Sequence, residues 1–108
     1  MTYRMLDSGA VSNVLDVKII NRTGDTRRYD VEVLDPAAEL SSTDLPLTLT
    51  GGAMGQATLH VTLPPDRFER GRADVVLRVV GDDGFEREYS QHVLGPLYGG
   101  APADGGGS

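Results

Sequence analysis

The stretch LDVKIINRTGD at residues 15–25, followed by YDVEV at residues 29–33, decides the fold. Apolar and charged side chains alternate along both runs, so each run has one face suited to a core and one suited to water. The polar segment Arg22–Asp25 contains a glycine and separates the two runs, as expected of a reversal between strands. The two runs therefore predict strands of antiparallel sheets.

The same alternation recurs along most of the chain. Further rows lie at residues 3–6, 45–49, 59–63, 73–79 and 85–93. Between the rows stand turn-forming segments, which are Asp35-Pro36, Gly51-Gly52, Pro64-Pro65 and Gly81-Asp82-Asp83-Gly84. Short alternating strands with frequent turns predict an all-β, immunoglobulin-like antiparallel β-sandwich of about seven strands. The best helical window, Pro65–Arg70, predicts one helical turn at a sheet corner.

Two of these strands are expected at sheet edges. Pro46 has no backbone N–H to donate and falls inside the row at residues 45–49. In the last row the alternation is imperfect, because Arg87 and Gln91 share a face with aromatic and aliphatic residues. We interpret that row as an edge strand or a strand with a bulge. Exposed edges of this kind are the expected docking surfaces for strand addition.

Composition bounds the class of protein. The chain has 108 residues, enough for one domain. We expect a sandwich over residues 1–96 and a flexible, glycine-rich tail over residues 97–108. The net charge of −6 comes from scattered acids, which disfavours nucleic acid as a partner. The nearest basic cluster, Arg67, Arg70 and Arg72, is diluted by neighbouring acids. No apolar run approaches the ~20 residues that span a bilayer, so we expect no direct membrane insertion by this segment.

The residues favour a binding module over an enzyme. There is no cysteine, which excludes disulfides, thiolate nucleophiles and iron–sulfur ligation within the chain. No serine lies in a Gly-x-Ser-x-Gly turn. We therefore predict no catalytic, cofactor-binding or metal-binding residue and no cofactor. A copper-binding alternative remains, because His60, His92 and Met54 would offer suitable ligands if their strands were neighbours.

Three further features are interpreted structurally. The acidic segment Gly81–Gly84 lacks the alternating ligands of a calcium loop and is expected to be a hairpin turn. The tripeptide Asn21-Arg22-Thr23 matches a glycosylation site but is interpreted as the turn at a strand end. Tyr29 and Tyr89 are expected in the core, since large aromatic side chains usually bury.

Four stretches resemble the C-terminal immunoglobulin-like domain of the FixG/CcoG family, in the same order. They are Tyr3–Gly9, Val11–Thr23, Tyr29–Val33 and Leu94–Pro96. The first is similar to the family's entry strand and Ser-Asp-Gly turn, and the last to its Phe-x-Gly-Pro exit. The second is similar to Ile-Arg-Asn followed by a strand of the form Leu-Lys-Ile-x-Asn-Lys, with Ser12 in place of the basic residue.

The resemblance implies a role within a larger protein. FixG-type proteins are bacterial membrane proteins that carry ferredoxin-type clusters and support assembly of a haem-copper terminal oxidase. Their redox work needs cysteines and membrane helices, so the resemblance implies a non-catalytic accessory domain here. It also implies protein partners, either the rest of the parent or an oxidase assembly complex, and a place on the periplasmic face of the inner membrane. The alternative is a β-sandwich module of another secreted or cell-surface bacterial protein.

Overall fold

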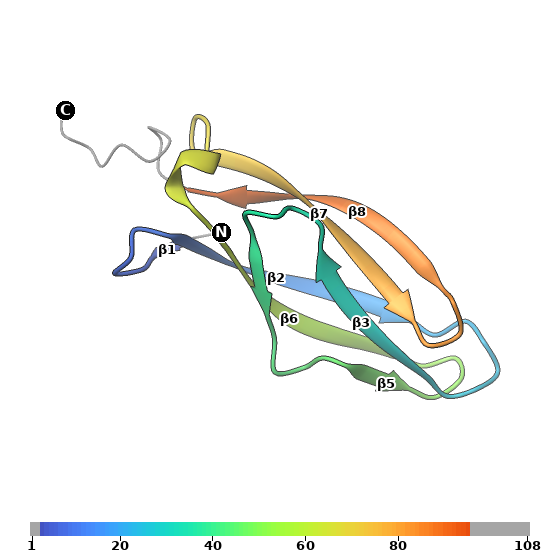
Figure 1. The fold of residues 1–108 in the computed structure, drawn as a ribbon. Helices are drawn as coiled ribbons and strands as arrows, with labels where there is room; N and C mark the ends of the chain where they lie inside the picture. The colour runs from blue at the N-terminus through green and yellow to red at the C-terminus, as the bar shows by residue number, and fades with distance from the viewer. Residues whose placement is uncertain (1–2, 96–108) are drawn as a thin grey trace, which may run out of the picture.

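A computed structural model describes residues 3–95 of the chain, which form two antiparallel sheets packed face to face (Figure 1). Each sheet has four strands. The first has the order β1-β2-β6-β4 and the second β5-β3-β7-β8. The strands are β1 (Tyr3–Met5), β2 (Val11–Ile20), β3 (Arg27–Val33), β4 (Glu39–Ser41), β5 (Leu47–Leu49), β6 (Met54–Leu63), β7 (Arg72–Gly81) and β8 (Glu86–Leu94).

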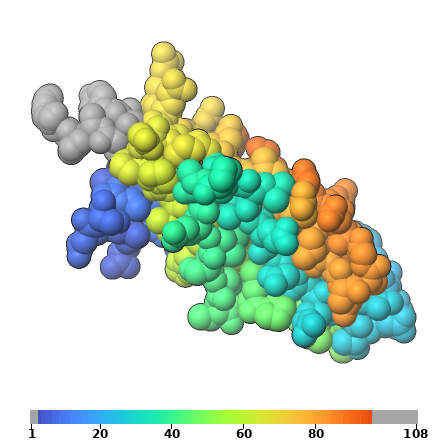
Figure 2. All heavy atoms as spheres, viewed as in Figure 1, coloured from blue at the N-terminus to red at the C-terminus, as the bar shows by residue number. Residues whose placement is uncertain are grey.

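Each layer contains one long ladder. In the first sheet β2 pairs with β6 without interruption, from Val11 opposite Leu63 to Ile20 opposite Met54. In the second sheet β7 pairs with β8 from Arg72 opposite Leu94 to Val80 opposite Glu86. The outer face of the second sheet is filled by side chains of β3, β7 and β8, with β8 at its margin (Figure 2).

The predicted fold class is confirmed, with one strand more than expected. The added strand is β4, which spans three residues and is too short to show alternation. The two predicted edge strands, β5 and β8, are at the edges of the second sheet. The ladder of β8 is continuous, so the bulge considered for it is absent from this strand. The predicted helical turn is a 3₁₀ turn at Pro65–Arg67.

The core consists of the inward members of the alternating rows. Sixteen apolar residues are buried there: Val11, Leu15, Ile19, Tyr29, Val31, Leu49, Ala57, Leu59, Val61, Leu63, Phe68, Ala73, Val75, Leu77, Val79 and Val93. Burying an aliphatic or phenyl side chain of this size contributes roughly 1.5–3 kcal/mol each. The prediction for Tyr29 is confirmed, whereas the prediction for Tyr89 is wrong, because its side chain is 46% exposed.

Phe68 closes one end of the sandwich. It follows the 3₁₀ turn and is buried among residues of both layers. A Cβ atom on Gly95 would lie 2.4 Å from Cδ2 of the Phe68 ring, so the ring packs directly on the glycine backbone. The N–H of Gly95 donates to the carbonyl of Gly71 at 3.0 Å. The predicted tail at residues 97–108 lies outside the described residues.

Among residues 3–95, no helix has the length and apolar character needed to cross a membrane.

Candidate functional site

The structure separates the three residues of the copper-binding alternative. His60 lies on β6 in the first sheet and His92 on β8 in the second, so their strands are not neighbours. Met54 lies on the same strand as His60 but six residues away, which is roughly 20 Å along an extended chain. The Nδ1 atom of His92 contacts Asp74 on the adjacent strand. The geometry supplies no shared copper site.

The acidic segment Gly81–Gly84 is the β7–β8 turn, as predicted. Gly81 donates its N–H to the carbonyl of Phe85 at 2.8 Å. The carboxylates of Asp82 and Asp83 lie 4.0 and 3.6 Å from the guanidinium of Arg27. The Nε of Arg27 is buried and has no hydrogen-bond acceptor in the described structure, since its 3.6 Å approach to Asp83 is an ionic contact only. The carboxylates of Asp82 and Asp83 therefore interact with Arg27 of the same chain.

Asn21 is fully buried and holds the β2–β3 loop against the end of β5 and the turn that follows it. Its Nδ2 atom donates to the carbonyls of Asp25, Leu49 and Thr50 at 2.7–3.1 Å. Its Oδ1 atom accepts from the N–H and the hydroxyl of Thr23. A nitrogen engaged in this way has no access to a glycan-transferring enzyme, so the turn interpretation of the tripeptide is confirmed.

Asn13 is the second buried polar residue, and it joins the two sheets. Its Nδ2 atom donates to the carbonyl of Leu94 at 2.8 Å, and its Oδ1 atom accepts from the N–H of Leu94 at 2.9 Å. Asn13 belongs to β2 and Leu94 to β8, so one carboxamide pairs with the edge of β8 as a neighbouring strand would. The sequence offered no signal for this role beyond a polar residue at an inward position.

Beyond Asn13, β2 has a free edge. Strand β1 pairs only with Val11–Asn13. The N–H of Asn21 points to β6, because it donates to Ala53 at 2.9 Å, and backbone groups alternate in direction along an antiparallel strand. The even-numbered residues therefore direct their N–H and C=O groups away from β6. Over the described residues, Val14, Asp16, Lys18 and Ile20 have no strand beside them on that edge.

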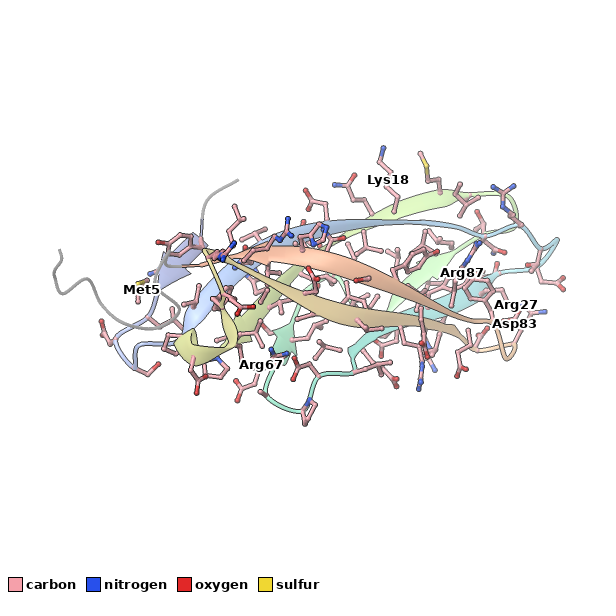
Figure 3. All side chains as sticks on the ribbon, turned by 90° about the horizontal axis from the view of Figure 1, so that it is seen from above. Met5, Lys18, Arg27, Arg67, Asp83 and Arg87 are labelled. Atoms are coloured by element: carbon pink, nitrogen blue, oxygen red, sulfur yellow. The ribbon has the colours of Figure 1, made fainter. Side chains whose placement is uncertain are left out.

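The inner face of β8 is uncovered over most of its length. Arg87 and Tyr89 are paired with Val79 and Leu77 and therefore point to the core side of the sheet. Val79 and Leu77 are buried, yet Arg87 and Tyr89 are exposed. Within residues 3–95, the first sheet has no strand beyond β2 to cover them. In Figure 3, β2 and β8 lie close together near Met5 and diverge toward Arg87.

A groove of about 210 Å³ occupies this divergence, and we call it the β2/β8 groove. It is lined by Lys18, Ile19, Ile20, Arg22, Thr23, Tyr29, Val79, Asp83, Phe85, Arg87 and Tyr89. The rings of Tyr29 and Phe85 meet edge to face with centroids 6.0 Å apart and form part of its apolar lining. Burial, and then the nearby carboxylate of Asp83, raises the pKa of the Tyr29 phenol above its ordinary value.

The charge of the groove is opposite to that of the domain. Three cations line it, Lys18, Arg22 and Arg87, and none of them forms an ion pair with another residue in the described part of the chain. The single acid in the lining, Asp83, is paired with Arg27. The guanidinium of Arg87 lies 5.9 Å from the centroid of the Tyr89 ring. In the other basic cluster Arg67 contacts Asp35, whereas Arg70 and Arg72 lie together beside Glu69.

Fold and site together define an immunoglobulin-like β-sandwich with an exposed strand edge and a basic, partly apolar groove beside it. The family model described as the IG-like fold at the C-terminal of FixG, which the same description gives as a proposed oxidoreductase, matches residues 1–96. The chain belongs to this family of FixG C-terminal domains. Among curated protein sequences no match was found.

A solved structure supports the fold independently. The crystal structure of a FixG-related protein from Vibrio parahaemolyticus superposes with a TM-score of 0.66 at 18% sequence identity. The match covers 83% of this chain and 84% of that one. At this identity the likeness shows a shared sandwich architecture.

Proposed function

We propose that this domain is a non-catalytic interaction module of a FixG-type membrane protein, placed on the periplasmic face of the bacterial inner membrane. Its task is to hold a protein partner while the parent supports assembly of a haem-copper oxidase. Family membership supports the link to a FixG-type parent. The chain has no cysteine, which supports assigning the redox chemistry of such a parent to its other segments.

The observation that carries the proposal is the pair of unpaired strand edges on the same side of the sandwich. β2 beyond Asn13 and β8 before Leu94 both present backbone groups without a neighbouring strand among residues 3–95. Natural sheets usually blunt or cover such edges, because a free edge pairs readily with another chain. An edge left open beside an apolar lining is the arrangement that strand addition uses.

Deletion of the domain from its parent tests the proposal. Bacteria producing the parent without residues 1–96 should assemble less terminal oxidase, measured as haem absorbance and oxygen consumption in isolated membranes. The cluster spectra of the truncated parent should remain unchanged, because the domain supplies no ligand. Unaltered oxidase levels, at equal amounts of parent protein, would refute the accessory role.

A further inference from the structure

We infer that the β2/β8 groove binds an extended, acidic segment of a partner protein, which adds to the free edge of β2 as a further strand. The inference deepens the proposed function and rests on it. It names the surface, the backbone groups and the charge of the segment that would occupy the groove.

The backbone of β2 sets the length and position of the added strand. From Val14 to Ile20 the free edge offers N–H and C=O groups at every second residue. Seven residues of extended chain span about 20 Å, the length of a typical strand. β1 already occupies the preceding part of this edge, opposite Val11–Asn13. An added strand therefore continues the line of β1 and widens the first sheet beneath β8.

The inner face of β8 supplies the cover for that strand. Phe85 and Tyr89 are 42% and 46% exposed, although both lie on the core side of the second sheet. A strand beside β2 would place alternate side chains against these rings, as in the rest of the sandwich. The gain is the burial of apolar surface, at roughly 25 cal/mol per Å².

Charge selects an acidic occupant. Arg22 approaches the groove from the turn after the first sheet, and Arg87 approaches from the second sheet. Lys18 borders the groove at the edge of β2, with its side chain on the outward face of the first sheet (Figure 3). Of the acids near these cations, Asp83 pairs with Arg27 and Glu88 with Arg78. Asp16, on the same edge as Lys18, accepts a hydrogen bond from the Thr58 hydroxyl at 2.9 Å. A basic groove on a domain of net charge −6 attracts a segment rich in aspartate or glutamate and repels a basic one.

A titration with two matched peptides tests the inference. The probe is a capped nonapeptide of repeating Val-Val-Glu-Glu, which places valine and glutamate on both faces of an extended strand. Its control is the same peptide with lysine in place of glutamate. We expect ¹H–¹⁵N shift changes confined to the free edge of β2 and to Phe85–Tyr89, with affinity at least tenfold weaker for the lysine peptide. The absence of shifts at about millimolar peptide, or equal binding of both peptides, overturns the inference.

Three variants separate the contribution of charge to peptide binding from that of the β2 backbone. Arg87→Glu should weaken glutamate-peptide binding at least fivefold, whereas Arg28→Glu, an exposed arginine outside the groove, should leave it unchanged. Val14→Pro keeps every charge but removes an edge N–H that no strand uses in the described structure, and it should weaken binding of the same peptide. Equal affinity of Arg87→Glu and the unaltered protein would refute the role of charge.

Two outcomes assign a failure to its source. If sedimentation shows a dimer and the same β2 amides become protected as it forms, the groove holds a second copy and the inference is wrong. If deleting the domain lowers oxidase assembly while Arg87→Glu and Val14→Pro in the parent do not, the inference fails and the proposed function stands.

Discussion

At one end of the β2–β8 edge the two sheets are joined, and at the other they diverge. At the joined end β1 covers β2, and the carboxamide of Asn13 satisfies both backbone groups of Leu94. At the open end no described strand covers β2, and Arg87 and Tyr89 of β8 face the core side yet remain exposed. The comparison indicates that a single buried amide marks the place where the sandwich closes, and beyond it the β2 edge has no neighbouring strand within residues 3–95.

Removing the side-chain amide of Asn21, which anchors the open end, should have the largest effect on stability. Asn21→Ala leaves three carbonyl oxygens without their shared donor, in a fully buried place. We expect a loss of about 3–4 kcal/mol in the free energy of unfolding, measured in urea. Asn21→Asp should be at least as destabilising, because it directs a buried carboxylate at the same carbonyls. A loss below about 1 kcal/mol for both variants would contradict the role assigned to Asn21.

Removing the two hydrogen bonds between Asn13 and Leu94 should lower stability less, because Leu94 is half-buried and water can replace part of the lost bonding. For Asn13→Ala we expect a loss of about 2 kcal/mol. The amide proton of Leu94 should also exchange faster in this variant. The matched control is Ser12→Ala, one residue away on the outward face, which should change stability little. Unaltered exchange at Leu94 would show that Asn13 does not hold the β8 edge.

Crowding the closed end should lower stability by a similar amount. In Gly95→Ala the new methyl group meets the Phe68 ring at 2.4 Å, so the ring must move. Overpacking of this kind costs about 1–3 kcal/mol. Combining it with Phe68→Leu should recover part of the loss, and a double-mutant cycle in urea measures the coupling. Strictly additive losses would contradict the contact.

Alkaline pH probes the open end through Tyr29. Burial raises the folded-state pKa of Tyr29. The stability that its neutral form contributes is therefore fully present below the ordinary tyrosine pKa near 10. As pH rises through the folded-state value, the unfolded chain releases the proton more readily and stability falls. Tyr29→Phe should remove that fall and change little at pH 7. An unchanged alkaline slope in this variant would exclude Tyr29 as its source.

Changes in the groove should have the smallest effect on stability. Lys18 and Arg87 make no ion pair within residues 3–95, so Lys18→Glu and Arg87→Glu should leave the midpoint of urea unfolding within error of the unaltered protein. A large loss of stability would mean that Lys18 and Arg87 stabilise the fold, and it would contradict their assignment to ligand binding.

A feature of the fold or of the groove could be predicted from the sequence only where a local sequence pattern specifies it. Alternation around Leu15 and Val31 specifies strands and their buried faces, and the turn residues around Asn21 and Gly81 specify the reversals. The prediction for Tyr89 failed because its position in the alternation is that of a core residue, whereas the first sheet, within residues 3–95, has no strand beyond β2 to cover it. How far one sheet extends beneath the other depends on the whole topology.

The same reason explains which parts of the site were missed. The edges of β5 and β8 were predicted from Pro46 and from the broken phase of the last row. The free edge of β2 was not, because its sequence is the most regular in the chain and its exposure follows from the shortness of β1. The bonding of Asn13 was not predicted, because a polar residue at an inward position does not specify a partner 81 residues away.

Amide hydrogen exchange of the whole domain tests the comparison most directly. We expect alternation along β2, with fast exchange at Val14, Asp16, Lys18 and Ile20 and slow exchange at the odd-numbered residues between them. On β8 we expect a slow amide at Leu94 and a fast one at His92, two residues earlier. The glutamate peptide should slow the fast amides of β2 alone. Uniform protection along β2, or equal exchange at Leu94 and His92, would contradict the account.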